Sequence, residues 1–239
     1  MKSPEAGPSG KMLVCKSYDS MSATVALHLS EQIRLKPDSC LGLPVGKSIS
    51  GCYELLARWT QARKDLNWQK ARCFALDDYL DVDETHSFQR FLHSKLYEFT
   101  NLEARNCFNP RFYENYDQLI AEAGGLDLCL LGIGKNGHIA FNEPGTPASS
   151  WTHCVWLSES TLEANKNYFA DGVKQPTRAI TMGISTILAS RKIILVATGQ
   201  GKKEILKKAL EGPPTDAIPA SFLTLHPNLI TVTDYHYSD

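Results

Sequence analysis

The sequence predicts one α/β domain: a doubly wound, mostly parallel sheet with helices on both faces. Three observations lead to this prediction. Short apolar runs alternate with segments of helical period, which is the pattern of repeated βαβ units. The chain has 239 residues and is 43% hydrophobic, enough to bury one sizeable core. No repeat or linker divides it, so we assign residues 12–239 to a single domain and the Pro-, Gly- and Ser-containing residues 1–11 to a flexible tail.

Each expected strand is a short apolar run that ends at polar or Gly-containing residues, and each expected helix has apolar side chains at helical spacing. The strands are expected at 41–44, 73–76, 126–131, 191–198 and 229–233. The helices are expected at 48–63, at 88–99, after the capping box Ser160-Thr-Leu-Glu163, and at 201–210. Parallel sheets bind ligands at the carboxyl ends of their strands, so the segments 45–48, 77–79, 132–145 and 199–202 should meet at one sheet edge.

Composition excludes several classes of protein. Lysine and arginine total 25 against 26 aspartate and glutamate, and such a near-neutral chain has no general attraction for nucleic acid or an anionic membrane. No apolar run approaches the roughly 18 residues of a membrane span, and the first residues lack the apolar stretch of a secretory signal. The seven cysteines are scattered, so we expect reduced thiols in a cytoplasmic protein. Because metal-ligand spacings such as HExxH are missing, we expect no metal and no cofactor.

The segment 132–145 is the strongest indication of a catalytic site. Its three glycines let the backbone approach a ligand closely, and His138 is the natural group to move protons near neutral pH. Glu143 can orient that imidazole or accept a proton in its turn. A turn with a purely structural histidine is the alternative, but the combination just after a buried strand favours a site. The spacing does not fit a dinucleotide fingerprint.

Further candidates follow the other strands. Asp77 and Asp78 end an apolar run and can act as a base on a carbon acid if burial raises the carboxyl pKa; a helix cap or a solvated turn is the alternative. Lys202 and Arg178 are candidate phosphate contacts, with solvated surface cations as the alternative. A strand, a glycine turn and a helix N-terminus make an anion site, although the first glycine of a P-loop is missing. This loop consists of Val45, Gly46, Lys47 and Ser48.

From about residue 13 to residue 234 the chain resembles the glucosamine-6-phosphate deaminase/isomerase family, which is related to the 6-phosphogluconolactonases. The most specific motif is Gly137-His-Ile-Ala-Phe-Asn-Glu-Pro144. Within the family, the motifs at 125–131, 135–138 and 218–223 are most similar to the galactosamine-6-phosphate branch. The other matching motifs are Leu41-Gly-Leu-Pro-Val-Gly46, Phe74-Ala-Leu-Asp-Asp-Tyr79, Ala179-Ile-Thr-Met-Gly183, Gly199-Gln-Gly-Lys202 and Leu225-His-Pro227.

The resemblance implies a reaction and roles for these residues. A hexosamine 6-phosphate, of gluco or galacto configuration, would become a ketose 6-phosphate plus ammonia. Asp77 would move the proton from C2 to C1, while His138, assisted by Glu143, would open the sugar ring. Lys202 and the 45–48 loop would hold the phosphate, and Gly137 and Arg178 complete the predicted binding residues. We expect a monomer or a small homo-oligomer rather than the allosteric hexamer of longer members.

Three departures from the family pattern bear on the site. Asn136 stands where many relatives have aspartate. An amide can accept a hydrogen bond from the imidazole but cannot stabilise its cation by charge, so we expect a less basic His138 whose main charged partner is Glu143. Lys47 replaces a usual glycine. The phosphate-binding arginine expected at 164–169 is not evident, which leaves Arg178 or Lys166 as substitutes.

Two other functions share parts of this pattern. A 6-phosphogluconolactonase keeps the Gly-His pair, but it does not require Asp77 and Glu143, which favour isomerisation. A non-catalytic sugar-phosphate sensor is the second alternative. The 11 residues before Met12 are too few for a DNA-binding segment, and the presence of Asp77, His138 and Glu143 together disfavours a sensor.

Overall fold

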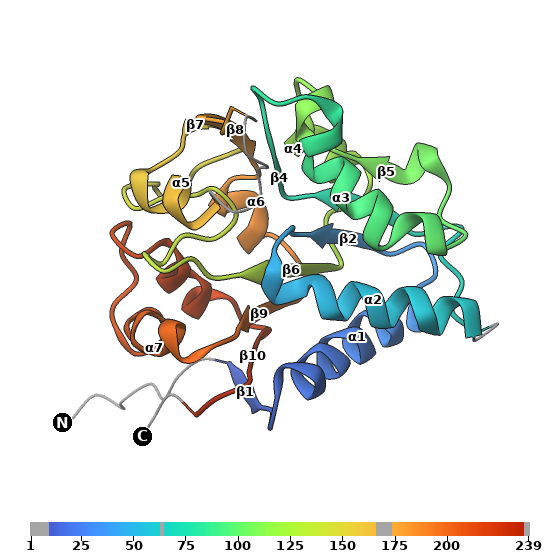
Figure 1. Cartoon of the computed structure of the whole chain (residues 1–239), viewed down its shortest axis with the longest axis horizontal. Helices are drawn as coiled ribbons and strands as arrows, with labels where there is room; N and C mark the ends of the chain where they lie inside the picture. The colour runs from blue at the N-terminus through green and yellow to red at the C-terminus, as the bar shows by residue number, and fades with distance from the viewer. Residues whose placement is uncertain (1–9, 63–64, 166–173, 237–239) are drawn as a thin grey trace.

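The computed structural model describes residues 10–62, 65–165 and 174–236. Most of the predicted tail, and the predicted substitute cation Lys166, lie outside these ranges. The central sheet has seven parallel strands in the order β1-β10-β9-β6-β2-β3-β5, which confirms the predicted α/β fold (Figure 1). The strands are β1 (Lys11–Val14), β2 (Cys40–Leu43), β3 (Arg72–Ala75), β5 (Cys107–Phe108), β6 (Leu128–Gly132), β9 (Ile193–Ala197) and β10 (Leu229–Thr233). Lys11 belongs to β1, so assigning it to the tail is wrong.

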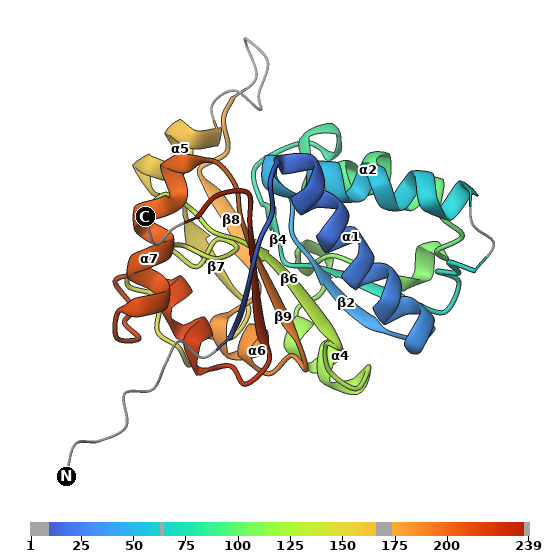
Figure 2. The same cartoon turned by 90° about the horizontal axis from the view of Figure 1, so that it is seen from below.

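Helices cover both faces of this sheet because alternate strand residues point to opposite sides. Leu41 and Leu128 pack on one face with α1 (Tyr18–Leu35), α2 (Lys47–Ala62) and α3 (Phe88–Lys95). Cys40 and Cys129 point to the other face, toward α4 (Tyr116–Glu122), α6 (Ile184–Leu188) and α7 (Lys203–Glu211). Figure 2 shows the sheet nearly edge-on between α1 and α2 on one side and α6 and α7 on the other. The short 3-10 helices are η1 (Glu84–His86), η2 (Tyr97–Phe99), η3 (Ala104–Asn106), η4 (Pro110–Phe112), η6 (Gln200–Lys202) and η7 (Pro219–Leu225).

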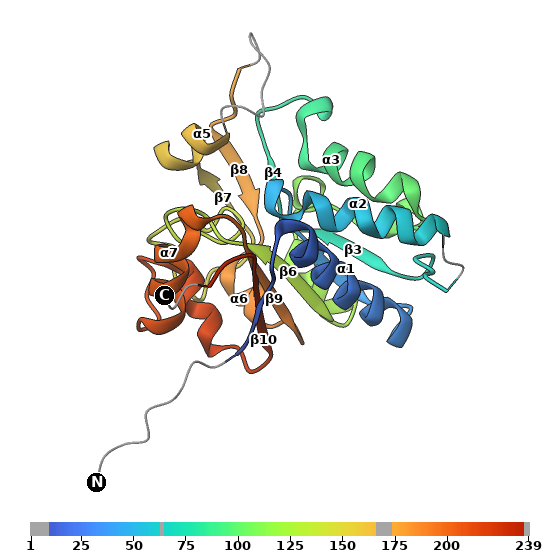
Figure 3. The ribbon, with the colours of Figure 1, turned by 60° about the horizontal axis from the view of Figure 1, so that its bottom comes forward.

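A second sheet, which the sequence did not predict, has three antiparallel strands. Its order is β4 (Asp77–Tyr79), β8 (Arg178–Thr181), β7 (His153–Trp156), and it lies with α5 (Glu159–Asn165) beside the carboxyl ends of the main sheet (Figure 3). The predicted start of α5 is wrong. The hydroxyl of Ser158 accepts a hydrogen bond from the backbone N–H of Thr161 and the helix begins at Glu159, so Ser158 is the capping residue in place of Ser160.

The order of the strands places a ligand site at one point of the sheet. From β2 the chain continues to β3 on one side, and it returns to β6 on the other side of β2. Parallel sheets bind ligands in the crevice outside such a switch point. The carboxyl ends of β2 and β6 lead into the segments 44–48 and 133–145, as expected. Within the described residues, no helix has the length and apolar composition needed to cross a membrane.

Candidate active site

A cavity of about 580 Å³ lies at the carboxyl ends of β2 and β6. All four segments that the sequence predicted to meet contribute to its wall, which confirms that part of the prediction. The first turns of α3 and the preceding residues add a wall that the sequence analysis missed. The residues of that wall are Thr85, His86, Ser87, Phe88, Arg90, Phe91 and Ser94.

His138 is held over the backbone of its own loop. The loop closes through a hydrogen bond from the N–H of Gly134 to the carbonyl of His138, 2.9 Å long. A Cβ atom at position 134 would lie only 2.2 Å from Cε1 of the imidazole. Glycine is therefore required at position 134 to make room for the histidine ring, and not, as the sequence suggested, for a ligand.

A chain of hydrogen bonds fixes the imidazole. Nδ1 of His138 lies 2.7 Å from Oδ1 of Asn136, and Nδ2 of Asn136 donates to Oε2 of Glu143 over 2.7 Å. The second carboxylate oxygen of Glu143, Oε1, accepts a hydrogen bond from the hydroxyl of Thr161, a residue of α5 that the sequence analysis missed. Nδ1 of His138 and Oε2 of Glu143 are 3.7 Å apart. The amide thus lies between the imidazole and the carboxylate.

This chain of hydrogen bonds determines which nitrogen of the His138 ring carries the proton. An ionised carboxylate only accepts hydrogen bonds, so the Asn136 NH₂ group must face Glu143 and its oxygen must face His138. That oxygen in turn requires a proton on Nδ1 of the imidazole. In the neutral ring, Nε2 is then unprotonated and can accept a proton from a ligand.

Burial lowers the pKa of His138 below its ordinary value, Glu143 opposes this shift, and Lys202 adds to it. The direction agrees with the predicted weak basicity, although burial rather than the missing carboxylate is its largest cause. Lys202 donates a hydrogen bond to the backbone carbonyl of Ile133 at the end of β6. Burial, together with the charge of Lys135, lowers the pKa of Lys202 to about 8.

Asp77 begins β4 and lines the cavity with a side chain that is 5% exposed. Burial, with a smaller contribution from the charge of Asp78, raises the pKa of the Asp77 carboxyl well above its ordinary value. Among the described residues no donor forms a hydrogen bond with this carboxylate. A raised pKa through burial is the condition under which this residue is predicted to act as a base.

The neighbouring carboxylate has a structural role. Asp78 is fully buried outside the cavity, because successive side chains of a strand point to opposite sides. It accepts hydrogen bonds from the backbone N–H groups of Tyr79, Phe88 and Gln89 and from Nδ2 of Asn109, at 2.8, 2.8, 3.3 and 2.6 Å. Asp78 therefore fastens the start of α3 to β4.

β8 connects the Asp77 side of the cavity to the His138 side. Thr181 pairs with Asp77 in the antiparallel ladder, and its hydroxyl accepts a hydrogen bond from the N–H of Phe141, 3.1 Å long. The amide of Asn142 donates to the carbonyl of the next residue, Met182, over 2.8 Å. The loop that carries His138 and the strand that carries Asp77 are thus bound to the same element.

Only some of the predicted binding residues line the cavity. The 45–48 loop and Lys202 line the cavity. Gly137 does not: its φ of 88° requires glycine, and an added Cβ would lie 2.7 Å from Ile218, outside the cavity. Arg178 is also outside, since its guanidinium lies over the ring of Trp156, 5.6 Å from the centroid. It is three strand residues, roughly 10 Å, from the position that pairs with Asp77. Gly137 and Arg178 therefore do not line this cavity, and their binding roles stay predictions.

Among the described residues, no group of three His, Cys, Asp or Glu side chains is arranged to hold a metal ion.

Comparison with known proteins decides the family. A family model described as glucosamine-6-phosphate isomerases/6-phosphogluconolactonase matches residues 16–231. The chain belongs to this family. Over 232 residues it is 40% identical to a family member from Lachnoclostridium phytofermentans named glucosamine-6-phosphate deaminase, covering 93% of this chain and 98% of that protein. A second deaminase of the family, from Rhodopirellula baltica, is 41% identical over 231 residues, or 92% of each chain.

Solved structures of the family agree with this assignment. A structure described as a monomeric glucosamine-6-phosphate deaminase matches with a TM-score of 0.90 at 35% identity, covering 95% of this chain and 98% of the other. The 6-phosphogluconolactonase from Trypanosoma cruzi matches with a TM-score of 0.74 at 20% identity, over 94% of each chain. The second likeness shows the shared fold alone.

Proposed function

We propose that this chain converts glucosamine 6-phosphate to fructose 6-phosphate and ammonia. The observation that carries the proposal is the pairing, in one cavity, of a buried carboxylate with raised pKa, Asp77, and an oriented imidazole, His138. These are the two proton-transfer groups that an aldose–ketose conversion requires. The deaminases at 40% and 41% identity support the same reaction.

Ring opening comes first because the C2 proton of a closed pyranose is not acidic. The unprotonated Nε2 of His138 takes the proton from the anomeric hydroxyl and returns it to the ring oxygen as the bond from C1 to that oxygen breaks. Glu143 stabilises the transient imidazolium through Asn136. The product of this step is the open-chain aldehyde.

Isomerisation follows at Asp77. The aldehyde makes the C2 proton acidic. The Asp77 carboxylate removes it while the aldehyde oxygen gains a proton, which forms an enolamine, and the resulting carboxylic acid then delivers a proton to C1 while the amino nitrogen loses one. This leaves an imine at C2, which water hydrolyses to the ketone and ammonia. A base with a raised pKa suits this step because proton transfer to carbon and from carbon must both be rapid.

The phosphate is bound by the 45–48 loop and Lys202 in this proposal. The loop leads into the N-terminus of α2, which begins at Lys47 in the cavity wall, and helix N-termini favour anions. Lys202 adds a cation from the β9 side. Phosphate binding would also restore the ordinary pKa of Lys202 by supplying an opposite charge.

An ammonia-release assay tests the proposal. Glucosamine 6-phosphate should yield equimolar ammonia and fructose 6-phosphate, and Asp77→Asn should abolish both. Hydrolysis of 6-phosphogluconolactone without release of ammonia from the amino sugar would contradict the proposal in favour of a lactonase. Binding of the sugar phosphate without turnover would contradict it in favour of a sensor.

Galactosamine 6-phosphate is the second substrate to compare, because the motifs at 125–131 and 218–223 resemble the galactosamine branch. The same assay with both sugars distinguishes the configurations at C4. We also propose that the chain is a monomer. The support is its likeness to the structure described as monomeric, and light scattering in solution measures the mass directly.

A further inference from the structure

The cavity concentrates positive charge in a chain whose formal net charge is -1. Among the described residues that line it, Asp77 is the only carboxylate. Four cations line the same cavity and come from different elements: Lys47, Arg90, Lys135 and Lys202. A site with this imbalance is suited to a ligand that carries more than one negative charge.

These cations come from two parts of the fold. Lys135 and Lys202 stand near His138, since the charge of Lys202 lowers the pKa of that histidine and the charge of Lys135 lowers the pKa of Lys202. Lys47 begins α2 and Arg90 belongs to α3. Helices α2 and α3 pack together, with Nζ of Lys95 3.3 Å from Oε1 of Glu54 (Figure 1).

Arg90 is placed by a rigid part of the fold. Ser87, Arg90, Phe91 and Ser94 all line the cavity, and their spacing of three and four residues corresponds to one helix face. Asp78 binds the first backbone N–H groups of that helix. The helix is therefore fixed to the strand that carries the proposed base.

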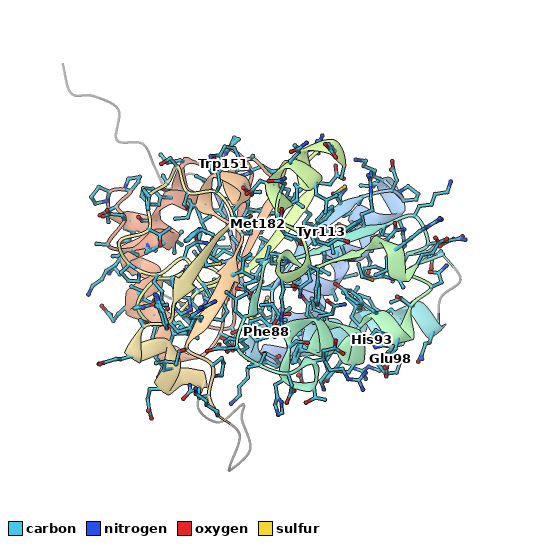
Figure 4. The ribbon with its side chains drawn as sticks, turned by 90° about the horizontal axis from the view of Figure 1, so that it is seen from above. Phe88, His93, Glu98, Tyr113, Trp151 and Met182 are labelled. Carbon is cyan, nitrogen blue, oxygen red and sulfur yellow. The ribbon has the colours of Figure 1, made fainter. Side chains whose placement is uncertain are left out.

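Aromatic packing fixes the same helix start. Phe88 packs against Tyr79 and Phe141, with ring centroids 4.6 and 5.7 Å apart. Figure 4 shows Phe88 near the middle of the molecule, close to the small sheet, whereas His93 and Glu98 lie together farther along the α3 region. The cavity end of α3 is thus held in place.

The guanidinium of Arg90 has no carboxylate partner among the described residues, and its side chain is exposed at the cavity. An unpaired arginine in a cation-rich cavity is available to bind a ligand anion. Guanidinium is planar and presents parallel N–H groups that match two oxygens of a phosphate. Lysine offers only a point charge.

We propose that Arg90 binds the 6-phosphate of the substrate from the α3 wall, together with Lys202 and the 45–48 loop. This inference rests on the proposed function, because it assigns a binding residue to the same reaction. Arg90 then supplies a cation that Arg178 cannot supply from outside the cavity. Arg90 acts on substrate binding. Among the described contacts, neither Asp77 nor His138 touches it.

The test compares Arg90→Met with Arg58→Met. Both substitutions remove one positive charge from an exposed arginine, but Arg58 lies on α2 outside the cavity. Loss of a charge-assisted hydrogen bond should raise the KM for glucosamine 6-phosphate about ten- to hundredfold in Arg90→Met. The kcat value should change little, and Arg58→Met should behave as wild type.

Inorganic phosphate supplies a readout that does not depend on turnover. Calorimetric titration should show weaker phosphate binding in Arg90→Met by a similar factor and unchanged binding in Arg58→Met. Unchanged KM and phosphate affinity in Arg90→Met, in an enzyme whose wild type releases ammonia, would overturn the role of Arg90 alone. Wild-type protein that binds phosphate but releases no ammonia would instead overturn the proposed function.

Discussion

Asp77 and His138 face the same cavity, but their surroundings differ. The carboxylate of Asp77 is buried without a hydrogen-bond donor among the described residues, and its pKa is raised. The imidazole of His138 is held by a continuous chain through Asn136, Glu143 and Thr161. The pKa of Asp77 is therefore set by burial without hydrogen-bond partners, whereas the orientation of the His138 ring is set by the partners that hold it. Removing hydrogen-bond partners should therefore affect the function of His138 and not that of Asp77.

The largest expected effect is that of Asp77→Asn. An amide cannot take the C2 proton, and loss of a general base typically costs ~10²–10⁴-fold in rate, so kcat should fall at least that far with little change in KM. Steady-state ammonia release measures both constants. Substantial turnover in this variant would exclude Asp77 as the base.

The same substitution should stabilise the fold at neutral pH. Because the pKa of Asp77 is raised on folding, ionising this carboxyl costs more free energy in the native state than in the unfolded chain. Stability is therefore lost as pH rises from the ordinary carboxyl range through the raised pKa of the native state. The amide of the Asp77→Asn variant cannot ionise, so the Tm of this variant should exceed that of the wild type at neutral pH, with a difference that shrinks in acid.

Asp78→Asn is the matched control, since it makes the same chemical change one residue away. The amide loses acceptors for four donors and leaves some of them unsatisfied, which should cost about 1–3 kcal/mol of stability. Thermal unfolding should show a lower Tm for Asp78→Asn and a higher one for Asp77→Asn. Equal shifts of Tm in the two variants would remove the distinction between the two carboxylates.

The second expected effect concerns the room that the His138 ring needs. Gly134→Ala places a methyl group 2.2 Å from the imidazole, so the ring must move, and a displacement of about 1 Å can cost roughly 10²-fold in kcat. Gly201→Ala is the control because nothing lies within 4 Å of its added Cβ. Ammonia-release kinetics should separate the two variants, and equal activity would show that the ring position is unimportant.

The third effect is on pH dependence. Asn136→Asp replaces a neutral partner of His138 with a carboxylate, which favours the imidazolium and raises the pKa of His138. Neutral imidazole is the active form in ring opening, so the acidic limb of the kcat/KM profile should move to higher pH. The new carboxylate also faces Glu143, at the 2.7 Å contact now made by the amide, so the two carboxylates should repel each other. NMR titration of His138 measures the shift directly, and an unchanged titration would argue against electrostatic control at position 136.

The sequence predicted the main sheet better than the small one for a physical reason. Strand β10 is buried along its whole length, so its apolar run 229–233 marks its bounds. Strands β4, β7 and β8 are short and alternate buried with exposed residues or contain charges, so no apolar run marks them. The place of Arg178 outside the cavity could not be predicted, because the antiparallel pairing of β8 has no local signal in the sequence.

The residues of the candidate site, too, could be predicted together only where they lie close to one another in the sequence. The motif 132–145 identified His138, Asn136 and Glu143 together because they are near one another in sequence. The residue pattern did not distinguish Asp77 from Asp78, and only the family resemblance selected Asp77. The direction of strand β4 sends one side chain into the cavity and the other toward α3. Thr161 and Arg90 were missed because each is an ordinary helix residue until the fold brings it to the cavity.

The smallest expected effect concerns Thr161, at the far end of the chain of hydrogen bonds that holds His138. Thr161→Val keeps the shape of the side chain but removes the hydroxyl that donates to Glu143. Loss of a hydrogen bond with a net worth of about 0.5–1.5 kcal/mol should lower kcat roughly two- to tenfold. With one donor fewer, the Glu143 carboxylate holds the Asn136 amide and the His138 ring less firmly, so the acidic limb of the pH–rate profile should also move. Thr161→Ser restores the hydroxyl and should recover both the rate and the pH profile, which a general packing defect would not allow. A Val variant with lower kcat but an unchanged pH profile would mean that Thr161 supports α5 and not the orientation of Glu143.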